Sequence, residues 1–206
     1  MVTAARRAYH HGNLRAAALD RAAQLAADGG TGNLSLRALA RDLAVSPAAL
    51  YRHFADKDAL LAALAERALA ALDAALHAAL AAAPVADAPA RLVALGRGYL
   101  AFARAHPDAF RIVFELRHGA PAQSSDGRRG ERPEGGPFAL LHKVVGALAP
   151  PHAPAARIQR VALSAWAFVH GLAALERQRA WRGDLTTVAD DLLRDYARAL
   201  ATSYPR

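Results

Sequence analysis

The chain has 206 residues, of which 54% are hydrophobic, and it carries a formal net charge of +8. A chain of this length and apolarity can bury a sizeable core, so the composition excludes a disordered tail or a fibre. The absence of cysteine excludes a disulfide framework, a thiol nucleophile and a thiolate zinc site. Because Ala, Leu and Arg dominate the composition, we expect a mostly helical protein with little or no sheet.

The first predicted helix spans residues 14–28. Asn13 before it is a good N-cap, and apolar residues recur on one face from Leu14 to Leu25 at helical spacing. Three closely spaced glycines then predict the end of this helix: Gly29, Gly30 and Gly32.

Two short helices joined by a tight turn are predicted next. Ser35 can cap the first, which continues to about Leu43, and Ser46 can cap the second, which runs from Pro47 to about Phe54. In a helix-turn-helix, the first of two such helices braces the second, whose outer face enters a major groove. The predicted core positions of this unit are Leu36, Leu39, Leu43, Val45, Leu50 and Phe54.

The remainder of the chain also predicts helices. Asp56 can cap a long helix whose end is marked by Pro84. Helical periodicity then recurs over 88–105, in a short helix through Phe110 and Phe114, and over 137–148, 155–179 and 185–203. Residues 117–136 are rich in Gly, Pro, Ser and charge and predict a flexible loop. The expected fold class is therefore all-α, with about nine helices.

No segment is expected to cross a membrane. The Ala-rich stretch 59–83 is broken by charged residues such as Glu66 and Asp73, and no apolar run follows Arg6 and Arg7 as it would in a secretory signal. We therefore expect a cytoplasmic protein with no membrane partner.

Positive charge is concentrated near the N-terminus. Residues 1–57 hold eight Arg or Lys and four Asp, which is half of the net positive charge of +8 in little over a quarter of the chain. Such a distribution favours a polyanionic partner. A genome-wide preference for Arg would produce the same excess, so the charge supports nucleic-acid binding without establishing it.

The run from Leu36 to Leu61 resembles the DNA-binding head of TetR-family regulators. Its Ser46-Pro47, Leu50-Tyr51-x-His53-Phe54 and Lys57-Asp58-x-Leu60-Leu61 motifs stand at the spacing of that family. The resemblance is strong over about residues 10–65, and the all-helical remainder agrees in length and layout. The opening Tyr9–Leu14 and the motif Trp166-x-x-x-His170-Gly171 are similar to one branch, the Trp-His-Gly (WHG) branch. The resemblance implies a helix-turn-helix domain over 1–57 and a helical effector-binding and dimerisation domain over 58–206.

The resemblance also implies a DNA interface, and the chemistry of the side chains agrees with it. Helix N-termini and arginines bind phosphate, and a methyl group can pack on thymine. Arg6, Arg7 and Arg15 are candidates for further contacts from an N-terminal arm, whereas we interpret Arg21 and Arg41 as solvated charges. The candidate DNA-binding residues are Ser35, Arg37, Ser46, Pro47, Ala48, Tyr51, His53 and Lys57.

In the family, the C-terminal domain holds a small-molecule effector and dimerises through its last two helices, so that two heads bind a palindromic operator. Alternatively, the apolar stripes of both helices could be buried in the core of a single subunit.

The candidate pocket residues could likewise be ordinary core residues, above all Phe110 and Phe114. These candidates are Tyr99, Phe102, Phe110, Phe114, Phe138, Trp166, Phe168 and His170.

Catalytic and metal signals are missing from the sequence. The nine histidines are scattered without an i, i+4 pair or an acidic partner at ligand spacing, and there is no phosphate loop or nucleophile elbow. We therefore expect no metal, no cofactor and no enzymatic activity. The predicted function is a ligand-responsive repressor, dimeric on a palindromic DNA operator and released by an unidentified small-molecule effector. The alternatives are a constitutive DNA-binding regulator, and a helical carrier or enzyme with a vestigial head.

Overall fold

In the computed structural model of the chain, the structure describes residues 14–84, 87–119, 135–180 and 183–202, with the backbone alone for 114–119. These described residues form nine α-helices and one short 3-10 helix and contain no strand, which confirms the all-α fold class. In chain order the elements are α1 (Leu14–Gly29), η2 (Thr31–Asn33), α2 (Leu36–Asp42), α3 (Pro47–Tyr51), α4 (Lys57–Ala81), α5 (Ala88–Ala105), α6 (Pro107–Gly119), α7 (Pro137–Leu148), α8 (Ala155–Gln178) and α9 (Leu185–Thr202).

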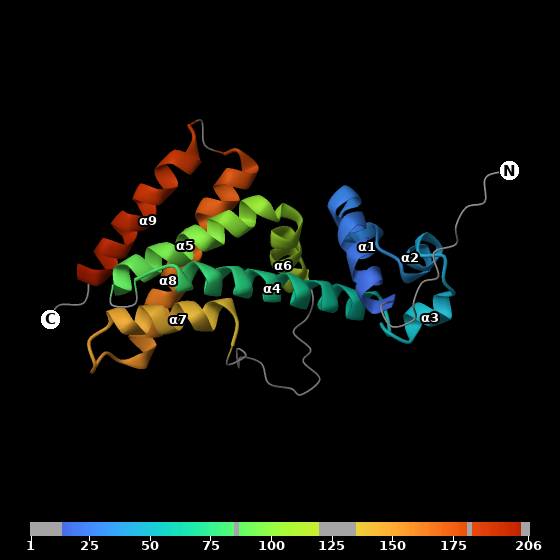
Figure 1. Cartoon of the computed structure of the whole chain (residues 1–206), viewed down its shortest axis with the longest axis horizontal. Coiled ribbons are helices and arrows are strands. Elements are labelled where there is room, and N and C mark those ends of the chain that lie inside the picture. Colours follow the sequence, from blue (N-terminus) through green and yellow to red (C-terminus); the bar gives the residue numbers. More distant parts are fainter. Residues whose placement is uncertain (1–13, 85–86, 120–134, 181–182, 203–206) are drawn as a thin grey trace. The chain divides into compact units, whose positions relative to one another are not determined.

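The chain divides into two compact units (Figure 1). The first extends to Ala68 and takes up the chain again at Arg111; the second begins at Leu69, continues to Phe110 and includes α7, α8 and α9. Helices α4 and α6 thus contribute to both units. The domain boundary expected after residue 57 falls at the first residue of α4.

The first unit packs α1 against α2 and α3 around an apolar core. Leu39 and Leu50 are fully buried, and Leu36 and Phe54 are nearly so. Leu43 and Val45 are partly buried and pack against the same cluster, so the six predicted core positions are confirmed. Burial of these side chains fixes which face of α3 remains outside.

The turn between α2 and α3 is closed by the backbone. The amide of Val45 donates to the carbonyl of Ala40 at 3.0 Å, and the amide of Ala44 donates to the carbonyl of Arg41 at 3.1 Å. This pair of bonds is a Schellman motif, which requires a left-handed residue after the helix. Ala44 is that residue, with φ of 54°, a conformation that costs a non-glycine residue energy.

In the second unit, α5 contacts α7, α8 and α9. Two glycines of α5 allow its close approach to other helices. A Cβ at Gly98 would lie 2.8 Å from the Cβ of Ala79 on α4, and a Cβ at Gly96 would clash with Leu193 on α9. The Gly96-x-Gly98 pair therefore serves helix packing.

The expected helix bounds agree with the structure to within a few residues. Residues 88–105 and 137–148 form α5 and α7 as predicted. Helix α3 ends at Tyr51, earlier than the expected Phe54, and α8 ends at Gln178, where Arg179 adopts a left-handed conformation with φ of 49°. The predicted cap Asn13 and most of the expected loop, 120–134, lie outside the described residues, and α6 extends to Gly119.

Candidate nucleic-acid interface and effector pocket

The N-termini of α2 and α3 are capped by serines at the positions that the sequence predicts. Oγ of Ser35 accepts a hydrogen bond from the amide of Ala38 at 3.4 Å, and Oγ of Ser46 accepts one from the amide of Ala49 at 3.2 Å. Both serines are exposed. Each helix therefore begins at the surface, where its remaining N-terminal amides are available to an anion.

Three polar side chains of the head, on α2, at the end of α3 and just after it, lie exposed without polar partners. Arg37, Tyr51 and His53 are exposed, and in the described part of the chain none of their side chains makes a hydrogen bond or an ion pair. Tyr51 is 46% exposed. Pro47 and Ala48 lie exposed at the first turn of α3. Seven of the eight candidate DNA-binding residues are thus exposed on one unit.

Lys57, the eighth candidate, has a partner that the sequence did not reveal. Its Nζ donates to the carbonyl of Gly32 in η2 at 2.7 Å, and the side chain is half-buried. Asp56 caps α4 by accepting from the amide of Ala59 at 2.7 Å. A phosphate near the N-terminus of α4 would therefore compete with the carbonyl of Gly32 for the ammonium group of Lys57.

Two further arginines of the first unit have side-chain partners. Arg15 lies with its guanidinium 5.6 Å from the ring centroid of Phe54, and Arg21 forms an ion pair with Asp42 at 2.8 Å. The Arg21 side chain is 37% exposed, so it stays in contact with water while paired, and its interpretation as a solvated charge stays a prediction. Arg41 is exposed and makes no ion pair within the described residues. The proposed arm residues Arg6 and Arg7 lie outside the described residues.

A pocket opens in the second unit between α4, α5, α7, α8 and α9. Its volume, with its open mouth included, is about 440 Å³. Its walls are almost entirely apolar and are formed by Leu76, Leu92, Leu95, Gly96, Tyr99, Pro137, Leu141, Ala165, Trp166, Phe168, Val169, Leu193 and Tyr196.

The pocket includes only some of the aromatic residues that the sequence nominated. Tyr99, Trp166 and Phe168 line it. Phe102 and Phe110 are buried core residues, and the pocket lining does not include them, Phe138 or His170. The side chain of Phe114 lies outside the described residues. Phe110, Phe138 and His170 contact the wall residues Tyr99 or Trp166 without lining the pocket themselves. That these three residues and Phe102 face an effector stays a prediction.

Tyr99 connects the pocket to the aromatic residues behind it. Its hydroxyl lies 3.0 Å from Nδ1 of His170, and its ring meets Trp166 and Phe110 edge to face at centroid distances of 5.5 and 5.7 Å. Burial raises the pKa of Tyr99, so this phenol stays neutral at ordinary pH. The side chains of Trp166 and His170, one helical turn apart on α8, therefore both contact Tyr99.

Tyr196 is a wall residue that is not among the pocket candidates predicted from the sequence. Its ring stacks on that of Phe168 at 4.3 Å with an interplanar angle of 8°, and its hydroxyl lies 2.8 Å from Oγ of Ser164. It lies within the predicted helix over 185–203, and the helical periodicity of that segment does not separate a pocket residue from an interface residue.

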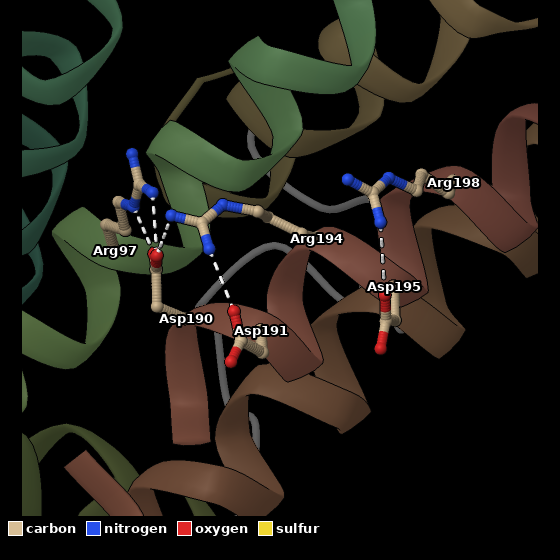
Figure 2. Close-up of polar contacts among 6 residues, drawn as sticks. All are labelled: Arg97, Asp190, Asp191, Arg194, Asp195 and Arg198. Carbon is tan, nitrogen blue, oxygen red and sulfur yellow. Dashed lines mark hydrogen bonds and ion pairs between the residues drawn. The ribbon is translucent and has the colours of Figure 1, made fainter. Parts of the chain in front are cut away.

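An ion-pair network joins α5 to α9 beside the pocket (Figure 2). Nη2 of Arg97 donates to Oδ2 of Asp190 at 2.9 Å, and the Nε of Arg97 donates to the other oxygen of that carboxylate. Arg194 also pairs with Asp190, and it reaches Asp191 at 2.8 Å. Hydrogen bonding from Arg97 lowers the pKa of Asp190, so the carboxylate remains charged and the network stays formed at neutral pH.

One histidine departs from the expectation of isolated histidines. Nδ1 of His77 lies 3.4 Å from a carboxylate oxygen of Asp73, one turn earlier on α4. The expectation that no histidine has an acidic neighbour one turn away was therefore wrong at this position. Within the described part of the chain, no group of three metal-ligating side chains gathers there or elsewhere.

The first unit is a three-helix head that contains a helix-turn-helix, and the outer face of its second helix is exposed. The second unit is helical and contains an apolar pocket. This combination is typical of a DNA-binding regulator. Comparison with protein families agrees. Residues 18–64 match the family described as bacterial regulatory proteins, tetR family, and residues 92–200 match the tetracyclin repressor-like C-terminal domain. The chain belongs to the TetR family of transcriptional regulators.

Solved structures of similar proteins share this fold. A Rhodococcus sp. RHA1 protein of unknown function is 32% identical, with a TM-score of 0.74, and the match covers 98% of this chain and 100% of that one. A TetR variant from Acinetobacter baumannii AYE, in complex with minocycline, is 25% identical, with a TM-score of 0.56 and coverage of 95% and 96%. A tetR-family regulatory protein from Rhodococcus RHA1 shares the fold at 19% identity, with a TM-score of 0.63 and coverage of 90% and 96%. A search of curated proteins found no match.

Proposed function

We propose that this chain is a ligand-responsive repressor that binds a palindromic DNA operator as a homodimer and is released by a small-molecule effector. The observation that carries the DNA-binding part is the outer face of the head. The side chains of Arg37, Tyr51 and His53 are exposed there and make no hydrogen bond or ion pair in the described part of the chain. A face of this kind provides the donors that phosphates and base edges require.

The dimer is supported by a second apolar face on the last two helices. The inner faces of α8 and α9 are buried in their own unit through residues such as Val169 and Leu193. Four large apolar side chains remain exposed on the same two helices: Leu163, Leu175, Val188 and Leu192. A second copy of the chain would cover this face with matching apolar residues, as an isologous dimer requires.

The outer face of helix α8 is apolar and largely unburied, which favours a partner that covers it. The helix has the length and apolarity of a membrane-spanning helix, with mean hydropathy of 1.3 over an 18-residue window of which only 28% is buried. A core helix of a soluble protein passes the same composition test, and α8 packs on α5, α7 and α9 along its inner face. Membership of a DNA-binding family favours a protein partner for the outer face and a cytoplasmic location.

Effector response is supported by the pocket and by the family. An apolar pocket with few polar groups is typical of small-molecule sites. The solved TetR variant in complex with minocycline is a family member with a bound small molecule. We also assign the chain to the WHG branch, because Trp166 and His170 of its motif meet at Tyr99.

The proposal is tested by fluorescence anisotropy with DNA from the region upstream of the gene and with unrelated DNA of the same length. We expect selective binding that Ala48→Glu abolishes, because Ala48 is exposed on the first turn of α3. Ala101→Glu on the exposed face of α5 is the matched control and leaves binding unchanged. Equal affinity for both DNAs would overturn the regulator proposal.

A further inference from the structure

We propose that the effector of this protein is an uncharged, predominantly apolar molecule, an aromatic or aliphatic skeleton with at most one neutral polar group. The inference rests on the proposed function, because it assigns a ligand chemistry to the pocket of the second unit. It follows from three features of the described residues: the composition of the walls, the hydrogen bonds of the two tyrosines, and the pairing of the neighbouring charges.

The walls offer hydrocarbon and no charge. Leucines from α4, α5, α7 and α9 form much of the surface, and the lining residues include no Asp, Glu, Lys, Arg or His. An anion or cation that entered would lose its hydration without gaining a counter-charge, which is costly in an apolar site. An apolar skeleton loses little and gains contact with the walls.

The tyrosine hydroxyls of the walls already have partners. Oγ of Ser164 donates to the carbonyl of Val161 at 2.9 Å, which uses its single proton. In the 2.8 Å contact between Ser164 and Tyr196, the phenol is therefore the donor. The Tyr99 hydroxyl is bonded to His170. A carboxylate ligand needs several donors to replace its hydration shell, and these hydroxyls are already engaged.

Two arginines that flank the walls are paired with aspartates. Arg97 follows the wall residue Gly96, and Arg194 follows the wall residue Leu193. Figure 2 shows that the guanidinium groups of Arg97 and Arg194 converge on Asp190. Neither arginine is among the residues that line the pocket. The positive charge of these two arginines is therefore offset by carboxylates outside the pocket.

The test uses three probes with one aromatic skeleton, β-naphthol, β-naphthoate and β-naphthylmethylammonium, in isothermal titration calorimetry with the full chain and no DNA. We expect the neutral naphthol to bind at least roughly tenfold more tightly than either ion. Ions that bind as tightly as the naphthol, or three probes that all fail to bind, would overturn the proposal.

Two variants locate the binding. Ala165→Phe places a ring where the wall residue Ala165 leaves space, and we expect it to abolish naphthol binding, whereas Ala101→Phe on exposed α5 does not. Because Ala165 is buried, a second variant, Phe168→Ala, removes a half-buried ring from the stack and lowers naphthol affinity by roughly tenfold. Unchanged affinity in folded variants contradicts binding at this pocket.

The proposed function and this inference fail in different ways. Operator release is followed separately by anisotropy. If naphthol binds the pocket but leaves the operator complex intact, the ligand chemistry holds and the effector response of the proposed function fails. If a charged compound releases the operator by binding to the pocket, the effector response holds and the ligand chemistry fails.

Discussion

The ammonium of Lys57, at the first residue of α4, donates to the backbone carbonyl of Gly32 at 2.7 Å. The bond connects the start of the long helix to η2, the short element between α1 and α2. It joins residues that are 25 positions apart in the chain. The same lysine is a candidate DNA contact by family resemblance, so its charge has both a structural use and a proposed binding use.

Replacing Lys57 by Met keeps the stem of the side chain and removes the hydrogen bond. We expect Lys57→Met to lower the free energy of unfolding by about 1 kcal/mol, the typical net value of one hydrogen bond. Urea denaturation measures the change. The other lysine of the chain, Lys143, is exposed on α7 and provides the control Lys143→Met, which we expect to be neutral. Equal effects of the two substitutions would contradict a structural role for the Lys57 bond.

Ala44 offers a stabilising substitution. Its φ of 54° lies in the left-handed region that glycine adopts without steric cost. We expect Ala44→Gly to raise the free energy of unfolding by about 0.5 kcal/mol, because relief of a strain of about 1 kcal/mol exceeds the extra chain entropy that glycine gains on unfolding. Ala74→Gly, in the exposed interior of helix α4, should lower stability by about 1 kcal/mol. If both substitutions destabilise the protein equally in urea, the turn conformation is not as described.

The Arg97–Asp190 pair predicts a pH dependence of stability. Arg97 lowers the pKa of Asp190 below its ordinary value of 3.8, so the pair contributes fully above that pH. The contribution is lost as the pH falls through the lowered pKa, where the carboxylate is protonated. Because the side chain of Arg97 is 52% exposed, water screens the pair, and we expect a contribution of about 1 kcal/mol at neutral pH.

Urea denaturation of the wild type and of Asp190→Asn between about pH 2 and pH 7 measures this contribution. The two stabilities should converge at the acid end of the range. Asp191→Asn serves as the control, because Asp191 pairs with Arg194 and not with Arg97 among the described residues and is 74% exposed. A difference that stays constant with pH would rule out the ion pair as its source.

The apolar outer face of α8 and α9 predicts the effect of a charge placed on it. Leu163 is 49% exposed in the single chain. If a second copy covers it, Leu163→Glu buries a carboxylate and should raise the dimer dissociation constant by roughly tenfold to a hundredfold. Sedimentation at several concentrations gives the constant. Ala78→Glu, on the exposed side of α4, adds the same charge elsewhere. A dimer that tolerates Leu163→Glu as well as Ala78→Glu would place the interface on another surface.

The helices and the head could be predicted from the sequence because their signals are local. Capping serines at 35 and 46 and leucines at helical spacing fix the start, end and buried face of each short helix. The pocket could not be predicted in the same way. Phe110 and Tyr99 have the same apolar signature in the sequence, yet only Tyr99 lines the pocket.

Contacts between distant parts of the chain carry no sequence signal of this kind. Tyr196 and Phe168 lie on different helices, and nothing in either helix alone indicates that their rings stack. The last helix also has two apolar faces, one buried through Leu193 and one exposed through Leu192. Periodicity shows that such a helix is apolar, but only packing shows which face is left for a partner.

The central claim is that the outer face of the head binds DNA, and the salt dependence of affinity tests it most directly. Arg37 and Arg41 lie on the same short helix, are both exposed, and make no ion pair within the described residues. The slope of log affinity against log salt concentration reports the number of phosphate contacts. We expect Arg37→Ala to weaken operator binding and to reduce the slope by about 1, and Arg41→Ala to leave both unchanged. An unchanged slope for Arg37→Ala, or equal losses for the two variants, would contradict the account.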